Sequence, residues 1–270
     1  SKPPFLKVKN KIVWVTGASS GIGAALVKRL AHQGAIVVLS ARRLEKLKEV
    51  RDEAGLLESN SMILPLDLED LSLVDEKVDQ VVAKFGRIDI LINNGGVSQK
   101  SRALETKDDI DRKLMEVNFW GGVFLTKAVA KQMRVQREGH VVAIASILGK
   151  FGLPLLGTYA AAKHAIYGWY ESLRYELKQD GIKVTIISPG FINTEVTYKS
   201  LTEDGSSLNQ NSIAQEKGMS ATKCARKVVS AIENDRWHKY IGGVEIFMPL
   251  VKWFLPRPFA WLMTRLSKPN

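Results

Sequence analysis

Apolar runs and amphipathic stretches alternate along most of the chain. Residues 12–15 form a short apolar run rich in β-branched side chains, and residues 21–34 follow with apolar positions at helical spacing. An apolar run without polar alternation predicts a strand that is buried on both faces, as in a parallel sheet. The same pattern predicts strands at 35–39, 62–66, 88–92, 140–145, 183–187 and 239–241, and helices at 42–57, 71–85, 108–137, 158–179 and 221–233.

Six or seven such β-α units follow one another without a change of composition. They predict one α/β domain over residues 1–270, a doubly wound Rossmann domain with a parallel sheet of about seven strands. Ligands of such sheets bind beyond the carboxyl ends of the strands. Residues 191–218 are polar and weakly patterned, which predicts a substrate lid.

Residues 245–267 form an aromatic C-terminal extension. Its aromatic side chains, among them Trp253 and Trp261, alternate with prolines and with the cations Lys252, Arg257 and Arg265. This composition fits a segment that lies on a membrane surface, a flap over an apolar pocket, or a contact between subunits. The sequence leaves these three alternatives open.

Composition narrows the function classes. The chain is 45% hydrophobic and 25% charged, as in an ordinary globular protein. One cysteine and four widely spaced histidines exclude an intrachain disulfide framework and predict no metal site. The net charge of +11 indicates an anionic partner or simply a solvated basic surface. Because the sequence has no block of like charges and no nucleic-acid-binding motif, we expect a phosphorylated small molecule and no nucleic acid.

The two ends of the chain carry little targeting information. We find no apolar segment typical of a secretory signal and no run of 18 uncharged apolar residues. We therefore expect a cytoplasmic protein, or one peripheral to a membrane. Ser1 fits either a removed methionine or a removed amino-terminal anchor, and in the second case the membrane would be the endoplasmic reticulum.

A glycine-rich turn, Thr16-Gly-Ala-Ser-Ser-Gly-Ile-Gly23, separates the first predicted strand from the first helix. Glycines allow a close approach of the backbone to a ligand, and the helix amino terminus offers free N–H groups to phosphate. We therefore predict nucleotide binding here. The candidate contacts are Gly17, Ser19, Ser20, Gly21, Ile22 and Gly23.

The second predicted strand is followed by Arg42 and Arg43. Dinucleotide folds place the residue that senses the ribose about 20 residues beyond the glycines. An acid there would accept from the 2′-hydroxyl of NAD, whereas arginines suit a 2′-phosphate. The sequence therefore favours NADP over NAD.

Tyr159 and Lys163 are four residues apart, so they lie on one face of a helix. A tyrosine with its usual pKa of about 10 is a poor acid or base at neutral pH, and a cation one turn away favours tyrosinate. We therefore expect Lys163 to lower the pKa of Tyr159. Ser146, just past the preceding strand, is placed to hydrogen-bond the reacting oxygen. Together the three residues predict a proton-transfer site.

By these motifs and the others below, the chain resembles the short-chain dehydrogenase/reductase family from Lys11 to about Tyr240. The residues that carry the resemblance are Gly17, Gly21, Gly23, Asn93-Asn94-Gly95-Gly96, Asn118, Ser146, Tyr159, Lys163, Pro189-Gly190 and Thr194. Gly95 replaces the alanine that is commoner in the Asn-Asn-Ala-Gly motif, and this keeps the side chain small. The segments 96–99 and 146–149 and the aromatic C-terminus look most like the dehydrogenase/reductase member 7 branch and its bacterial relatives. Many members of that animal branch are membrane-associated, which favours the membrane alternative for the tail.

The resemblance implies a role for each matching residue. Tyr159 would be the general acid in reduction and the base in oxidation, and Lys163 would hold the nicotinamide ribose. Ser146 would orient the carbonyl, and Asn118 would anchor a water of the proton relay. The remaining implied cofactor contacts are Asp67 to the adenine, Asn94 to the adenosine ribose region and Thr194 to the carboxamide.

The function expected from all of this is NADP(H)-dependent interconversion of a carbonyl and an alcohol. Leu148, Phe151, Leu153 and Leu155 lie between Ser146 and Tyr159, which favours an apolar steroid-, retinoid- or lipid-like substrate, unless these residues are simply core. The alternative is a catalytically weak NADP(H) sensor or membrane-surface binding protein on the same scaffold.

Subunit assembly is predicted from two helices. Trp120, Trp169, Tyr170 and Tyr175 give residues 108–137 and 158–179 more aromatic surface than one sheet face requires. The family pairs these helices between subunits, which predicts a homodimer or homotetramer.

Overall fold

A seven-stranded parallel sheet forms the centre of the computed structural model, which describes residues 7–194, 198, 200–210 and 216–266. The strand order is β3-β2-β1-β4-β5-β6-β9, so the chain reverses direction across the sheet between β1 and β4. The predicted fold class is confirmed. The strands are β1 (Ile12–Thr16), β2 (Ile36–Ser40), β3 (Ser61–Ile63), β4 (Ile90–Asn93), β5 (Gly139–Ile144), β6 (Ile182–Pro189) and β9 (His238–Ile241).

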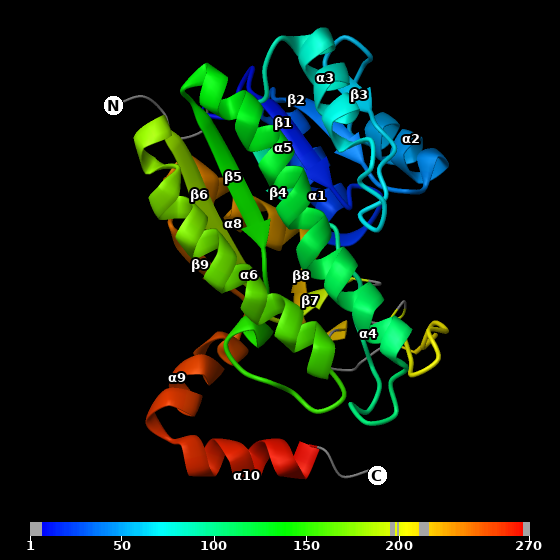
Figure 1. Ribbon diagram of the computed structural model, residues 1–270, viewed down its shortest axis with the longest axis vertical. Helices are drawn as coiled ribbons and strands as arrows, with labels where there is room; N and C mark the ends of the chain where they lie inside the picture. The colour runs from blue at the N-terminus through cyan, green and yellow to red at the C-terminus, as the bar shows by residue number, and fades with distance from the viewer. Residues whose placement is uncertain (1–6, 195–197, 199, 211–215, 267–270) are drawn as a thin grey trace.

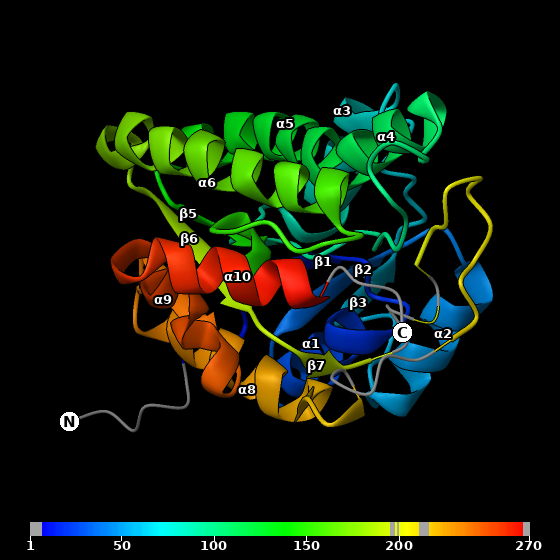
Figure 2. The same cartoon turned by 90° about the horizontal axis from the view of Figure 1, so that it is seen from below.

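Helices cover both faces of the sheet (Figure 2). One face carries α3 (Val74–Phe85), α4 (Asp108–Met115), α5 (Gly121–Gln136) and α6 (Gly157–Glu176), and the other carries α1 (Gly21–His32), α2 (Leu44–Glu53) and α8 (Ala221–Glu233). Trp14 of β1 packs into the core on the first side, whereas Val13 and Val15 pack on the second. This is why the run has no polar alternation.

The helix predicted over 108–137 contains one turn of different geometry. Residues Glu116–Trp120 form a π-helical turn between α4 and α5. Asn118 lies in this turn, and its amide donates to the carbonyls of Leu114 and Val97, both at 2.9 Å. A π turn inserts an extra residue and is frequent at functional sites. The bond to Val97 is a tertiary contact, so periodicity alone could not have predicted this turn.

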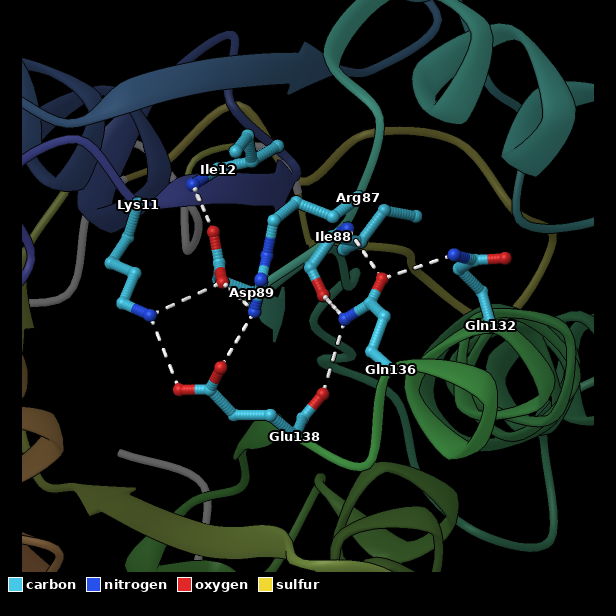
Figure 3. A network of polar contacts seen from close by, with 8 residues as sticks. All are labelled: Lys11, Ile12, Arg87, Ile88, Asp89, Gln132, Gln136 and Glu138. Atoms are coloured by element: carbon cyan, nitrogen blue, oxygen red, sulfur yellow. Dashed lines mark hydrogen bonds and ion pairs between the residues drawn. The ribbon is translucent and has the colours of Figure 1, made fainter.

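A polar network joins the amino ends of β1, β4 and β5, at the opposite edge from the glycine turn (Figure 3). The buried carboxylate of Asp89 accepts from the Ile12 amide at 2.8 Å and pairs with Arg87 at 2.7 Å and Lys11 at 3.3 Å. Glu138 bridges the same two cations at 2.7 and 3.2 Å, and the Arg87 guanidinium lowers the pKa of this carboxyl. The network ties the amino ends of these three strands together.

His140 of β5 is expected to make the stability of the fold sensitive to acid. Its side chain is 7% exposed and contacts the Thr185 hydroxyl at 2.8 Å. Burial lowers its pKa to about 4, below the ordinary 6.5. Between these two values the unfolded chain binds the proton and the folded chain does not, so stability falls as the pH falls. We expect this group alone to cost about 2 kcal/mol between about pH 7 and pH 5.

Chemical denaturation at a series of pH values measures this loss. The His140→Gln variant should show a shallower decline of the free energy of unfolding over the same range. An identical slope in the two proteins would assign the acid sensitivity to other groups.

The chain segments that complete the molecule gather at the carboxyl ends of the strands. A short parallel pair, β7 (Ile192–Asn193) and β8 (Met219–Ser220), lies there, and so do α9 (Met248–Phe254) and α10 (Pro256–Leu266) (Figure 1). Of the predicted lid, 195–197, 199 and 211–215 lie outside the described residues, as do Ser1 and residue 267 of the extension. No helix in the described part of the chain is long and apolar enough to cross a membrane.

The aromatic residues on which the predicted subunit contact rests differ in exposure. Tyr170 is buried and its hydroxyl contacts Asn93 and Thr126, each at 3.0 Å. Trp120 and Tyr175 are exposed. The homodimer or homotetramer stays a prediction that rests on the exposed members of the set.

Candidate active site

The glycine turn leaves no room for side chains where it meets the loop after β4. A Cβ at Gly23 would lie 2.1 Å from the Gly17 carbonyl oxygen, and one at Gly17 would lie 2.8 Å from Gly95 Cα. Gly17 also has a φ of +63°, which favours glycine. Ser20 precedes α1 without a side-chain cap, and the first turn of this helix has no acid. The turn therefore presents backbone N–H groups and a positive helix end, which suit a phosphate.

The Asn94 side chain stabilises the glycine turn by hydrogen bonds. Its side-chain amide donates to the carbonyls of Thr16 at 3.0 Å and Gly17 at 3.4 Å. The side chain thus holds the glycine turn in shape. The contact to an adenosine ribose, which the resemblance implies for Asn94, stays a prediction.

Arg42 and Arg43 have different partners, although they are adjacent in sequence. The Arg43 guanidinium reaches the Ser19 and Ser20 hydroxyls of the glycine turn, at 3.2 and 3.5 Å. Arg42 instead faces Glu69 at 3.5 Å. Arg43 lines a surface pocket of about 500 Å³ together with Ser19, Ser20, Gly21, Thr194 and Lys46, among others. Arg43 is therefore the better placed of the two to meet an anion at the turn.

Two further predicted cofactor contacts lie near the same edge. Asp67 follows β3, is half-buried, and accepts from the Glu69 amide at 3.0 Å. The Thr194 side chain lies against Gly21, where a Cβ on the glycine would be 3.3 Å from Thr194 Cγ2. The structure thus brings the glycine turn, Arg43 and Thr194 together around the amino end of α1.

The predicted proton-transfer residues meet at the carboxyl end of β5. Lys163 is 5% exposed and its ammonium donates to the carbonyl of Ile144, the last residue of β5, at 3.1 Å. The same ammonium lies 5.5 Å from the centre of the Tyr159 ring. Ser146 follows β5 and accepts from the Leu148 amide at 3.2 Å. Its hydroxyl is near enough to the phenol of Tyr159 to favour tyrosinate.

Asn118 is connected to this group through the loop after β4, which contains Gly96. Its carbonyl oxygen accepts from the Val97 amide at 3.1 Å. A Cβ at Gly96 would lie 2.7 Å from that oxygen and 3.8 Å from Lys163 Nζ. Gly96 therefore separates Asn118 from Lys163 by about the width of one small group. The four residues predicted to be catalytic therefore lie close together: Asn118, Ser146, Tyr159 and Lys163.

The pKa values in this cluster differ from the sequence-based expectation. Tyr159 as a whole is half-buried, and desolvation of its phenol raises the pKa of Tyr159 to about 12 in spite of the opposing effect of Ser146. Burial also lowers the pKa of Lys163 to about 8. The expected lowering of the Tyr159 pKa by Lys163 is therefore wrong for the chain by itself, because desolvation of the phenol sets the direction of the shift and Ser146, not Lys163, opposes it. At neutral pH the Tyr159 phenol is therefore protonated and can donate its proton.

One buried residue of the site had no role assigned from the sequence. Gln99 is 1% exposed, and its side-chain oxygen accepts from the Tyr159 amide at 3.1 Å, within the first turn of α6. Its amide nitrogen donates to the Ser101 hydroxyl at 3.0 Å. Gln99 therefore fixes the turn that carries Tyr159 to the loop after β4. Its place in the motif at 96–99 was the available signal, but sequence does not show that this side chain faces a helix sixty residues later.

An apolar wall lies beside Tyr159. It combines the 3₁₀ turn Ile147–Gly149 and the following loop with the C-terminal helices. Its buried members are Ile147, Leu148, Phe151, Ala160 and Phe259. The Phe151 and Phe259 rings meet edge to face with centroids 5.4 Å apart. Leu155, which the sequence placed in this wall, is exposed with a φ of +68°, and Leu156 packs there instead.

Comparison with known proteins identifies the scaffold. The sequence profile described as "short chain dehydrogenase" matches residues 11–205. The chain belongs to the short-chain dehydrogenase/reductase family. It is 39% identical to "Dehydrogenase/reductase SDR family protein 7-like" of Anopheles gambiae, over 97% of this chain and 84% of that one. It is 37% identical to "Dehydrogenase/reductase SDR family member 7" of Homo sapiens, over 98% of this chain and 80% of that one.

Solved structures of the short-chain dehydrogenase/reductase family include complexes with both dinucleotides. A metagenomic short-chain oxidoreductase in complex with NADP is 27% identical, with a TM-score of 0.71 over 87% of this chain and 97% of that one. A protein from Burkholderia phymatum in complex with NAD has a TM-score of 0.81 over 98% of this chain and 99% of that one. At 22% identity the second likeness shows the fold alone. As an oxidoreductase of this family, the chain fits a nicotinamide dinucleotide at its cradle of glycines and uncapped helix end.

Proposed function

We propose that this chain is an NADP(H)-dependent oxidoreductase that interconverts carbonyl and alcohol groups on apolar substrates of steroid, retinoid or lipid-like size. The observation that carries the proposal is the half-buried Tyr159, which belongs to the cluster of Ser146 and Lys163 on one side and to the apolar wall on the other. A protonated phenol beside an apolar surface suits the reduction of an apolar ketone.

Each residue of the proposed site would have its own role in catalysis. When bound, the nicotinamide supplies the hydride. Ser146 and Tyr159 orient the carbonyl oxygen by hydrogen bonds, and Tyr159 gives it the proton. Lys163 holds the ribose and is charged below a pH of about 8. The apolar wall excludes water from the reacting carbon.

NADP preference rests on Arg43. Its contacts to Ser19 and Ser20 place a guanidinium beside the glycine turn, and no carboxylate of the described residues is hydrogen-bonded to it. A guanidinium and two hydroxyls give a phosphate several charge-assisted donors. A ribose hydroxyl would use only part of this set.

A substrate panel tests the proposed function. We expect NADPH oxidation to proceed with bulky apolar ketones and aldehydes at kcat/KM values at least about tenfold above those of small polar carbonyls, since burying a few apolar groups against the wall is worth that much. Faster turnover of the polar set would contradict the apolar substrate. Tight NADPH binding with no oxidation across the whole panel would favour the alternative, a binding or sensor protein.

Gln99 makes a separate prediction about positioning. In the Gln99→Leu variant the Tyr159 amide loses its acceptor. We expect kcat to fall about tenfold while NADPH affinity holds, since a buried hydrogen bond worth about 1 kcal/mol no longer holds the turn that carries Tyr159. Gln99→Glu keeps an acceptor oxygen and should retain most of the activity. Equal loss in both variants, or a loss of NADPH binding, would show that Gln99 acts only on folding.

A further inference from the structure

The C-terminal helix pair, α9 and α10, has two apolar faces. The inner face consists of Met248, Val251, Phe259 and Met263, which pack into the apolar wall beside Tyr159. The pair is held in place by the Lys252 ammonium, which donates to the Lys150 carbonyl at 3.0 Å. The inner face therefore covers the apolar wall beside Tyr159, where the proposed function places the substrate.

The outer face of the pair is exposed. Trp253 is 80% exposed and Phe254 is 72% exposed. The other exposed apolar side chains of the segment are Phe247 in the 3₁₀ turn before α9, Leu250 in α9, Leu255 between the helices, and Trp261 and Leu262 in α10. Both helices lie at one end of the molecule, beyond the carboxyl ends of the strands and away from the helical layers (Figures 1 and 2). Such a concentration of large apolar side chains marks an interaction surface.

The charge of the segment identifies the partner. Residues 246–265 contain the cations Lys252, Arg257 and Arg265 and no Asp or Glu. The Arg265 guanidinium lies 3.9 Å from the centre of the Trp261 ring, so cation and aromatic ring share one site. Tryptophan and phenylalanine with adjacent arginine and lysine are the composition of helices that lie in the headgroup region of a bilayer.

A second copy of the chain fits this surface less well. An isologous contact would bring the same cations of two helix pairs together, and residues 246–265 offer no carboxylate to pair with them. An anionic lipid surface instead supplies the opposite charge and takes up the exposed rings.

We propose that the outer face of the helix pair α9–α10 is a peripheral contact for an anionic lipid bilayer. Trp253, Phe254 and Trp261 enter the headgroup region, while Arg257 and Arg265 meet the lipid phosphates. Because the inner face of the same helices packs into the apolar wall beside Tyr159, the bound lipid surface would lie on the other side of the helices that cover this wall.

Vesicle cosedimentation with the full chain tests the proposal. We expect binding to vesicles of phosphatidylcholine mixed with phosphatidylglycerol, weaker binding to phosphatidylcholine alone, and a further decrease at high salt. The double variant Trp253→Glu/Trp261→Glu should bind at least about tenfold more weakly, because it removes two large apolar side chains from the contact. NADPH binding by each variant shows that it is folded.

A matched control separates this face from net charge. Leu104→Glu/Val135→Glu changes the charge equally at two exposed apolar positions outside the helix pair, and it should bind vesicles as the parent does. Equal loss in the two double variants would overturn the proposal, since binding would then follow net charge alone. Equal binding of the parent to both vesicle types would also overturn it. The same holds if the parent does not bind vesicles and instead forms a dimer that Trp253→Glu/Trp261→Glu abolishes.

Discussion

Replacing Tyr159 with phenylalanine should lower kcat for carbonyl reduction by about 10²–10⁴-fold, the usual contribution of a positioned general acid. The variant keeps the ring, which packs against the apolar wall, and loses only the hydroxyl beside Ser146. The glycine turn and Arg43 are untouched, so the dissociation constant for NADPH should stay within about twofold, as expected for distant sites that do not share partners. Steady-state kinetics and fluorescence titration with NADPH measure the two quantities.

Tyr175→Phe is the matched control for this experiment. Tyr175 is exposed and lies near the end of the same helix, α6, so the identical chemical change should leave kcat unaltered. If Tyr159→Phe retained turnover within about tenfold of the parent, the proton would come from another group.

The second large effect is expected at Arg43. In Arg43→Asp, the ratio of kcat/KM for NADPH to that for NADH should fall by about 10²-fold, because a charge-assisted hydrogen bond is lost and a repelling carboxylate is added. Arg42→Asp should change the ratio less, since the Arg42 guanidinium already faces Glu69. Both variants can be compared in one assay with the same carbonyl substrate.

Lys48→Asp is the control for the charge change. Lys48 lies on α2, pairs with Glu45 at 2.9 Å and does not line the pocket of Arg43. A larger effect from Arg42→Asp than from Arg43→Asp would move the phosphate contact to Arg42. A constant ratio in all variants would place the phosphate contact elsewhere.

The sheet and the common position of Tyr159 and Lys163 could be predicted because both depend on local patterns. The apolar run at 12–15 needs only burial on two faces to become β1, and the four-residue spacing of Tyr159 and Lys163 fixes their common face on α6. The predicted element boundaries differ from the structure by a few residues. The helix expected from residue 71, for example, begins at Val74.

The remaining features depend on contacts between distant segments. The π turn at Asn118 carries two hydrogen bonds to Val97, twenty-one residues earlier, and the raised pKa of Tyr159 follows from desolvation of its phenol. The preference for Arg43 over Arg42 depends on how the start of α2 faces the glycine turn. Likewise, the sequence does not show which side of the aromatic tail is buried, because this depends on the contact of Phe259 with Phe151, more than one hundred residues earlier.

The most direct test of the proposed chemistry is a crystal structure of the chain with NADP⁺ and the alcohol product of its best substrate. We predict that the product oxygen lies within hydrogen-bond reach, about 2.6–3.2 Å, of both the Tyr159 and Ser146 hydroxyls, with the nicotinamide ribose at Lys163. A product oxygen held by other groups, with the Tyr159 hydroxyl directed away from it, would contradict the account.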